Sequence, residues 1–258
     1  MYIGVDVGSV STNAVLIDNK MNLIAFSIVK SGFDHRAAAN EVIANVCGKA
    51  GICVTRINDI VSTGYGRRNV PSAGKTFTEI TCHSKGINFL APEICTVIDI
   101  GGQDSKVIRV SENGFAETFS MNDKCAAGTG RFLEVMALTM GIEIDKLGAL
   151  ALASRKIEPI SSICTVFAES EVVSKIADGK PRESIAAGIH QAICERLMGM
   201  ITAMGIRKPV ALTGGVAKNN CIRSMLSLYL GETCYVPEEP QIVGALGAAI
   251  LACNTNPL

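Results

Sequence analysis

The feature that most constrains this chain is an internal repeat of an acidic segment that contains glycine. Residues 5–17 align with residues 98–110, so that Asp6 falls on Asp99. Each copy has the pattern of a strand, an aspartate, a glycine turn and a returning strand, and a third strand pattern follows each copy. Two copies of one such unit predict two similar sheets in a pseudo-symmetric molecule of two lobes, with a cleft between the lobes.

Hydrophobic periodicity extends this prediction along the chain and indicates an α/β protein. Strands are expected at residues 2–7, 14–18, 22–29, 57–62, 96–100, 105–110, 115–120 and 210–213. Helices are expected at residues 35–49, 79–90, 182–204 and 243–252, and the chain is mostly helical after Met121. The dipeptide Asn113-Gly114 predicts a hairpin turn between two of these strands.

The composition excludes several classes of function. The 24 basic and 24 acidic residues cancel, so no basic field predicts binding to nucleic acid or to a membrane surface. The longest apolar run, at 242–253, is too short to cross a bilayer. A strand pattern begins at Tyr2 where a signal peptide would lie. We therefore expect a soluble cytoplasmic protein with a core rich in small residues.

The two repeated hairpins have the chemistry of phosphate binding. Glycine turns offer closely spaced backbone N–H groups to an anion without a Cβ in the way. Asp6 and Asp99 end the strands that precede these turns. Carboxylates beside two phosphate cradles suit Mg²⁺, which prefers oxygen ligands. The phosphate-binding residues predicted in the two hairpins are Gly8, Ser9 and Ser11 in the first, and Gly101, Gly102 and Lys106 in the second.

A third glycine turn and a helix of small residues follow later in the chain. Gly214 and Gly215 end the strand at 210–213, where a flat nucleoside ring can lie against the backbone. The order of these features resembles the actin, sugar-kinase and heat-shock-chaperone ATPase superfamily. That resemblance implies two ribonuclease-H-like lobes with ATP and Mg²⁺ between them. The lobes are expected at residues 1–93 and 94–241, with the helix at 242–253 packed back on the first.

Two of the ten cysteines stand outside the apolar patterns. Cys125 and Cys164 each lie in a loop with Gly, Ser or Thr, just before a helical stretch. A helix N-terminus favours a thiolate and an anionic cluster. A four-iron cluster needs four ligands, and a two-fold axis supplies the second pair from another copy of the chain.

Four runs of sequence resemble a narrower family. They are NDKCAAGTGR at 122–131, CTVFAESE at 164–171, TGYGR at 63–67 and VIDIGGQD at 97–104. They resemble the activator ATPases of 2-hydroxyacyl-CoA dehydratases, also called component A or archerases, of the BadF/BadG/BcrA/BcrD type. This resemblance implies a homodimer with one [4Fe–4S] cluster between its subunits, held by Cys125 and Cys164. It also implies ATP hydrolysis and transfer of one low-potential electron to a dehydratase or CoA-ester reductase, with a ferredoxin or flavodoxin as donor.

In this interpretation Asp6 and Asp99 hold Mg²⁺ through water. Gln103 and Asp104 follow the second glycine turn, so either could position the attacking water or simply stabilise the hairpin. One departure is Asn13, which stands where family members often have lysine, whereas Lys106 occupies the equivalent place in the second hairpin.

Two alternatives stay open at this point. A small-molecule kinase of the same superfamily would have a further substrate-binding domain and would leave both loop cysteines without a role. A nucleotide-sensing scaffold without enzymatic activity would have buried, inert cysteines.

Overall fold

The computed structural model describes residues 1–161 and 164–255, which fold around two sheets. The first sheet has the strand order β3-β2-β1-β4-β5 and the second has the order β8-β7-β6-β9. The strands of the first sheet are β1 (Tyr2–Val7), β2 (Ser11–Ile17), β3 (Leu23–Lys30), β4 (Asp59–Thr63) and β5 (Lys75–Thr76). The strands of the second are β6 (Thr96–Ile100), β7 (Ser105–Val110), β8 (Ala116–Asn122) and β9 (Val210–Thr213).

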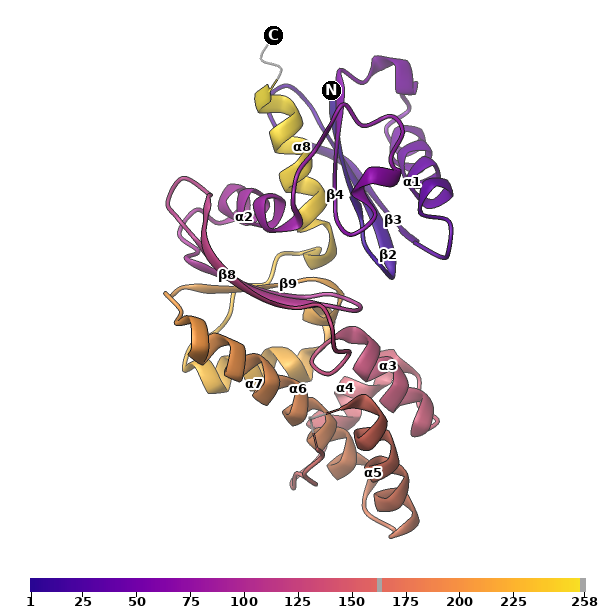
Figure 1. The fold of residues 1–258 in the computed structure, drawn as a ribbon, viewed down its shortest axis with the longest axis vertical. Coiled ribbons are helices and arrows are strands. Elements are labelled where there is room, and N and C mark those ends of the chain that lie inside the picture. Colours follow the sequence, from indigo (N-terminus) through magenta and orange to yellow (C-terminus); the bar gives the residue numbers. More distant parts are fainter. Residues whose placement is uncertain (162–163, 256–258) are drawn as a thin grey trace. The chain divides into compact units, whose positions relative to one another are not determined.

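Strand β1 is the centre of the first sheet and is buried along its whole length. It pairs antiparallel with β2, which places Asp6 opposite Asn13, and it pairs parallel with β4. Side chains of β1 alternate between the two faces, as a strand requires. Ile3 packs with helix α1 (His35–Lys49), whereas Tyr2 packs with helix α8 (Val243–Thr255) on the other face (Figure 1).

Helix α8 approaches its neighbours closely because small residues line it. A Cβ on Gly4 of β1 would lie 1.9 Å from the carbonyl oxygen of Ala245, and one on Gly247 would lie 1.8 Å from that of Cys82. Cys82 belongs to helix α2 (Glu79–Leu90), so α8 is in backbone contact with a strand and with a helix. Any larger side chain at these glycines would separate the elements.

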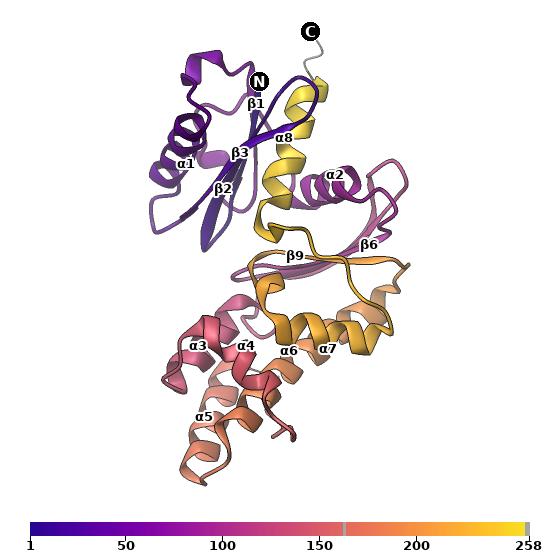
Figure 2. The ribbon, with the colours of Figure 1, turned by 180° about the vertical axis from the view of Figure 1, so that it is seen from behind.

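The helices after β8 build the core of the remaining part of the chain. Helix α6 (Arg182–Met204) and helix α7 (Asn220–Leu230) pack beneath β9 (Figure 2). Helices α3 (Gly130–Thr139), α4 (Ile144–Leu152) and α5 (Thr165–Ala177) complete this core. Short 3₁₀ turns lie at Val54–Arg56, Arg67–Asn69, Gly215–Lys218 and Pro240–Ile242.

By its internal contacts the chain separates into two units. The first comprises Met1–Val97, Ile108–Thr118 and Pro237–Leu258, and the second comprises Ile98–Val107 and Phe119–Val236. The boundary between these units runs through strands of the second sheet. The lobes at 1–93 and 94–241 stay a prediction, since they follow from the sequence repeat and not from contact density.

The α/β prediction is confirmed, and several predicted elements have the predicted ends. These are the strands at 2–7, 96–100, 105–110 and 210–213, and the helices at 35–49, 79–90 and 182–204. The strand predicted at 57–62 begins later, at Asp59, because the 3₁₀ turn at Val54–Arg56 leads into it. None of the helices in the described part of the chain is both long and apolar enough to cross a membrane.

Candidate functional site

The turn of the first hairpin is closed by its own backbone. Gly8 N–H donates to the carbonyl oxygen of Ser11 at 3.0 Å, and a Cβ on Gly8 would lie 2.8 Å from that oxygen. Ser31, which follows β3, supports the turn: its hydroxyl donates to Gly8 O at 2.6 Å and its N–H donates to Val10 O at 2.9 Å. These hydrogen bonds fix the shape of the turn and use the N–H of Gly8 within it, so the contact of Gly8 with phosphate stays a prediction.

Asp6 lies at the end of β1 with only 8% of its surface exposed. Its carboxylate fits between two glycines. A Cβ on Gly64 would come within 2.4 Å of Oδ1, and one on Gly244 would come within 2.3 Å of Oδ2. The same point at Gly244 lies 3.0 Å from Nε2 of the buried His83. Two glycines far apart in sequence are thus needed to accommodate this one carboxylate.

Asn13 is buried opposite Asp6. Its Nδ2 donates to the carbonyl oxygen of Gln241 at 3.3 Å. Its Oδ1 is buried and accepts no hydrogen bond from residues 1–161 or 164–255. Because buried polar atoms are normally paired, an unpaired acceptor of this kind indicates a place where a ligand or its bound water donates.

The second hairpin has an ionic centre. Lys106 is 2% exposed, and its Nζ lies 3.2 Å from Oδ2 of Asp99 and 2.8 Å from Oδ2 of Asp104. The other oxygen of Asp99, Oδ1, accepts a hydrogen bond from the Thr213 hydroxyl at 2.8 Å. A buried cation is thus held between two carboxylates, where low polarity strengthens each interaction.

Thr213 was missed as a site residue in the sequence. It ends strand β9, which is far from Asp99 along the chain and beside it in the second sheet. A hydroxyl directly before Gly214-Gly215 is the signal that points to it. Gly214 has a φ of 84°, and its Cβ would lie 2.4 Å from the carbonyl oxygen of Ile100. The structure therefore brings Asp99, Lys106, Thr213 and Gly214 together.

Gln103 and Asp104 differ in their surroundings. Asp104 is half-buried and paired with Lys106, and a Cβ on Gly101 would lie 2.3 Å from its Oδ1. Gln103 is exposed at the tip of the turn. The role of either residue in positioning water stays a prediction.

The turn after Gly215 is anchored to helix α6 by a buried polar chain. Asn219 caps helix α7, since its Oδ1 accepts hydrogen bonds from the backbone N–H groups of Cys221 and Ile222. Its Nδ2 lies 3.0 Å from Nε2 of His190, whose Nδ1 lies 2.7 Å from the carbonyl oxygen of Ala186. Burial lowers the pKa of His190, so the neutral ring donates from Nδ1 and accepts at Nε2.

The Cys125 loop is built from neutral hydrogen bonds. Asn122 Nδ2 donates to the carbonyl oxygens of Cys125 at 2.9 Å and Ala127 at 3.0 Å. The Thr129 hydroxyl donates to Ala126 O at 2.7 Å. Helix α3 then begins, and its first two backbone N–H groups bind the turn of the second hairpin. Gly130 N–H donates to Gly101 O at 2.9 Å, and Arg131 N–H donates to Gly102 O at 2.7 Å.

Cys164 is the N-cap residue of helix α5 and has an extended backbone. Its carbonyl oxygen accepts from Ala168 N–H at 2.9 Å, and its side chain is half-buried, as is that of Cys125. The next residue, Thr165, has a buried hydroxyl without a partner in the described residues. Cys164 therefore lies where the backbone N–H groups of helix α5 begin.

The ten cysteines, all of them described, are free thiols in different surroundings. Burial raises the pKa of Cys82 to about 12 and that of Cys221 to about 11, so these two stay protonated core residues. Cys53 and Cys95 are accessible as well, so exposure alone does not select the ligands. Within the described part of one chain, no three His, Cys, Asp or Glu side chains gather as a metal site. Cys125 and Cys164 therefore stay predicted cluster ligands, and they are two of the four that such a cluster needs.

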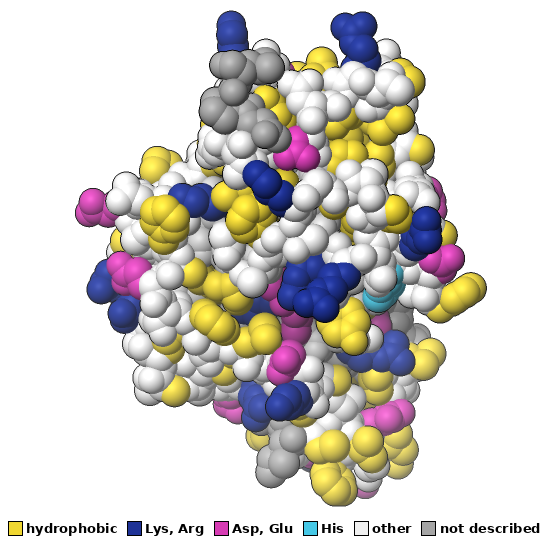
Figure 3. Space-filling model, turned by 45° about the horizontal axis from the view of Figure 1, so that its top comes forward, with side chains coloured by type: hydrophobic (Ala, Val, Ile, Leu, Met, Phe, Trp, Pro, Cys, Tyr) yellow, Lys and Arg dark blue, Asp and Glu magenta, His cyan; other side chains and the backbone are white. Residues whose placement is uncertain are grey.

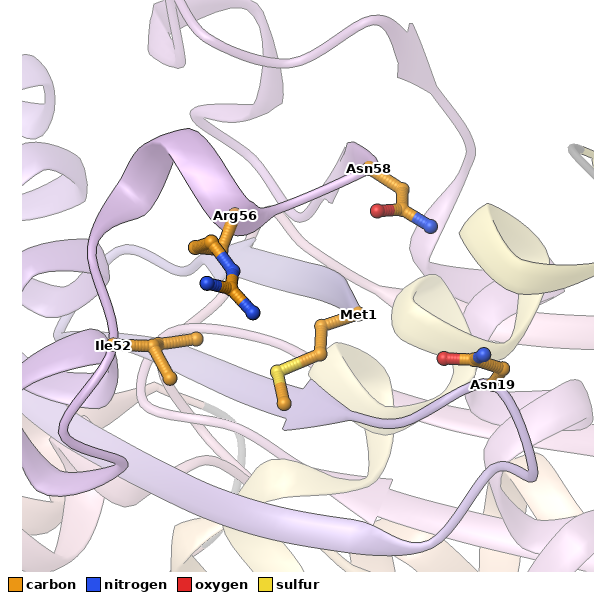
Figure 4. A pocket seen from close by; sticks show the side chains of 5 residues that line it. All are labelled: Met1, Asn19, Ile52, Arg56 and Asn58. Atoms are coloured by element: carbon orange, nitrogen blue, oxygen red, sulfur yellow. The ribbon is translucent and has the colours of Figure 1, made fainter.

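A cavity of about 360 Å³ opens elsewhere on the first unit (Figure 4). It is lined by Met1, Asn19, Ile52, Arg56 and Asn58. Met1 precedes β1, whereas Asp6 lies near its other end. The cavity contains none of the site residues predicted from the sequence.

The model of the BadF/BadG/BcrA/BcrD ATPase family matches residues 3–252. A 2-hydroxyisocaproyl-CoA dehydratase activator from Clostridioides difficile is 41% identical over 253 residues, which cover 98% of this chain and 95% of that protein. The crystal structure of component A of the Acidaminococcus fermentans (R)-2-hydroxyglutaryl-CoA dehydratase has a TM-score of 0.95 at 41% identity, covering 98% of both chains. The Clostridium difficile activator with bound ADPNP has a TM-score of 0.93 at 40% identity, covering 99% of this chain and 95% of that one. The predicted actin-like ATPase fold is confirmed.

Proposed function

This chain belongs to the BadF/BadG/BcrA/BcrD ATPase family, and on that premise we propose that it is an ATP-driven activator of a 2-hydroxyacyl-CoA dehydratase or a related CoA-ester reductase. It hydrolyses ATP and passes one electron at low potential to that partner enzyme. Relatives that are named activators of such dehydratases cover nearly the whole chain. A bound [4Fe–4S] cluster supplies the one-electron chemistry.

The observation that carries this proposal is the direct connection between a phosphate turn and a cysteine loop. Gly101 and Gly102 accept the first two backbone N–H groups of helix α3, and Cys125 lies just before that helix. Phosphate bound at this turn would therefore affect the position of helix α3, which follows Cys125. A small-molecule kinase of the superfamily would leave the two loop cysteines without a role.

The residues of each hairpin have separate parts in nucleotide binding. Asp6 and Asp99 are the carboxylates proposed to hold Mg²⁺ through water, where the metal neutralises phosphate charge. Gly214 and Gly215 would meet the nucleoside. The pairing of Asp104 with Lys106 favours Gln103 as the residue that positions the attacking water. The proposed phosphate contacts are Gly8, Ser9, Ser11, Gly101, Gly102 and Lys106.

The proposed homodimer is supported by an apolar surface next to Cys164. Leu138 on α3 and Val166 and Phe167 on α5 are 82%, 65% and 67% exposed. Figure 3 shows hydrophobic side chains gathered over α3 and α5 at the lower end of that face. A second copy that supplied its own Cys125 and Cys164 would cover this surface and complete four thiolate ligands. A ferredoxin or flavodoxin is the proposed electron donor.

The decisive test compares two cysteine variants of the protein purified without oxygen. Cys164→Ala removes two of four ligands from a symmetric dimer, so we expect loss of the cluster iron and of the dimer, with nucleotide binding retained. Cys194→Ala removes a buried thiol of α6, so we expect a loss of about 1 kcal/mol in unfolding free energy and full iron content. Iron per subunit, sedimentation mass and nucleotide affinity are measured for each. A full cluster in Cys164→Ala would rule out the proposed ligand set.

A further inference from the structure

Helix α5, which Cys164 caps, has little apolar contact with the rest of its unit. Ala168 and Val172 are its buried residues. Val166, Phe167 and Val173 are each more than half exposed. Two small buried side chains give little apolar burial for a helix of this length. Within one chain, polar contacts therefore contribute to its position.

The segment before Cys164 is itself firmly attached to helix α6. Glu158 N–H donates to the carbonyl oxygen of Ser184 at 3.0 Å. The carbonyl oxygen of Glu158 lies only 1.8 Å from where a Cβ on Gly188 would be, so the segment lies directly on the helix backbone. Ile160 is buried. Residues 158–160 are thus a fixed part of the α6 surface.

Three charged side chains join this segment to α5. Lys175 Nζ lies 2.8 Å from Oε1 of Glu158 and 3.6 Å from Oε1 of Glu171. The other oxygen of Glu171, Oε2, accepts the backbone N–H of Ser161 at 2.6 Å. Glu158 holds the pKa of Lys175 above its ordinary value, and Lys175 holds the pKa of Glu158 below its own. Glu171 is therefore oriented by Lys175 while it binds the main chain three residues before Cys164.

We infer that Glu171, oriented by Lys175 and Glu158, is a positioning residue that holds helix α5 against Glu158 and Ser161 and thereby sets the direction of the thiolate of Cys164, the N-cap residue of that helix. The inference rests on the proposed function of Cys164 as a cluster ligand. These residues form an ionic clamp, Glu158–Lys175–Glu171, between the α6 surface and helix α5. A hydrogen bond from a backbone N–H to a carboxylate is stronger than one to a neutral oxygen. Here the carboxylate of Glu171 binds the N–H of Ser161, three residues before the proposed ligand Cys164.

The test uses three variants of the full-length protein and two readouts. Glu171→Ala removes the acceptor, Glu171→Gln keeps an oxygen that can accept the Ser161 N–H, and Lys146→Met removes a lysine from the exposed Glu143–Lys146 pair on α4. The first readout is hydrogen exchange at the Ser161 amide in protein without iron. The second is the rate of iron transfer to a ferrous chelator from the loaded dimer, together with the electron paramagnetic resonance spectrum of the reduced cluster.

We expect exchange at Ser161 and iron release to be about tenfold faster in Glu171→Ala, since one charge-assisted hydrogen bond is lost. Glu171→Gln should restore most of the wild-type spectrum and release rate, and Lys146→Met should match wild type in both. Unchanged Ser161 exchange and an unchanged spectrum in Glu171→Ala would overturn the inference. A Glu171→Gln variant as impaired as Glu171→Ala would also overturn it, because the accepted N–H would not be the source of the effect.

The two readouts separate this inference from the proposed function. If wild-type protein binds no iron, the proposed function fails, while Ser161 exchange still reports on the clamp. If wild-type protein holds a cluster that Glu171→Ala leaves unchanged in rate and spectrum, the inference alone fails. Nucleotide affinity equal to that of wild type shows that each variant is folded.

Discussion

The two hairpins have the same backbone plan, but the residue opposite the strand-end aspartate is neutral in the first and positively charged in the second. In the first, Asp6 faces Asn13 across the strand pair, and Asn13 donates to a carbonyl oxygen while its own Oδ1 has no partner in the described residues. In the second, Lys106 stands at the position equivalent to Asn13 and pairs with Asp99 and Asp104. The repeat has therefore kept its carboxylates and changed the residue opposite them.

The difference shows that the same hairpin backbone can place either a neutral amide or the cation of a buried ion pair opposite its aspartate. The two choices affect stability and ligand binding differently. A buried ion pair is costly to desolvate and still more costly to break, since the remaining charge has no compensation. A neutral amide with a spare acceptor tolerates change and can take a hydrogen bond from a ligand. We expect the second hairpin to determine stability and chemistry, and the first to adjust nucleotide affinity.

The largest expected effect is on catalysis. Asp99→Ala should lower ATP hydrolysis by about 10³-fold, because a charged group at the reacting phosphates is lost, and should leave iron content unchanged. Asp6→Ala should behave similarly. Steady-state hydrolysis and iron per subunit are measured for both. Wild-type turnover in Asp99→Ala would remove this residue from the mechanism.

The second largest expected effect is a difference in unfolding free energy between variants of the two hairpins. Lys106→Met leaves Asp99 buried beside Thr213 without its cation, so the unfolding free energy should fall by about 3 kcal/mol. Asn13→Ala removes one neutral hydrogen bond, so the fall should be about 1 kcal/mol. Denaturant unfolding measures the loss of unfolding free energy in each variant. Equal losses would show that the ion pair has no special weight.

A smaller effect is expected when charge is added to the first hairpin. Asn13→Lys brings a cation to a place where phosphate is proposed, so ADP should bind about fivefold more tightly, the gain of a charged over a neutral hydrogen bond. Calorimetric titration measures the affinity, with Asn13→Gln as the control of similar length and no charge. Weaker ADP binding in Asn13→Lys would mean that this position does not face phosphate.

The smallest effect concerns pH and His190, which binds Asn219 and thereby anchors the turn after Gly215 to helix α6. Because burial lowers the pKa of His190 in the folded protein, the unfolded chain binds its proton more readily. The contribution of neutral His190 to stability is thus complete above the ordinary value of about 6.5 and is lost as the pH falls below it. Thermal unfolding at about pH 7.5 and 5.5 should show a decline that His190→Gln reduces. An identical decline in that variant would assign it to other groups.

Sequence patterns predicted the elements whose signals are local. Asn113-Gly114 gave the expected hairpin turn, and Gly114 has a φ of 71°. Helix α7 has local signals at both ends that hydrophobic periodicity does not detect, namely the capping Asn219 and Gly231, which has a φ of 67° at the helix end. Local chemistry is therefore enough to predict most of the strands and helices near the site.

The parts that could not be predicted depend on contacts between distant segments. Thr213 binds Asp99 because β9 joins the second sheet, and no local pattern encodes that pairing. Glu171 lies in the part of the chain expected to be mostly helical, where no local pattern identifies its partner, and the structure places its carboxylate on the backbone N–H of Ser161. Side-chain partners of this kind are decided by tertiary packing, not by spacing along the chain.

The packing of helix α8 affects the order in which parts of the chain can fold during synthesis. Its backbone contacts β1, which is synthesised first, and α2, with no room for a Cβ at Gly4 or Gly247. The first sheet emerges from the ribosome early, yet one of its faces stays uncovered until α8 has been translated. The second unit needs no residue beyond Val236 and can close its core sooner. A ribosome stalled before α8 should therefore hold a nascent chain whose later-made half is protease-resistant while its earlier-made sheet is not.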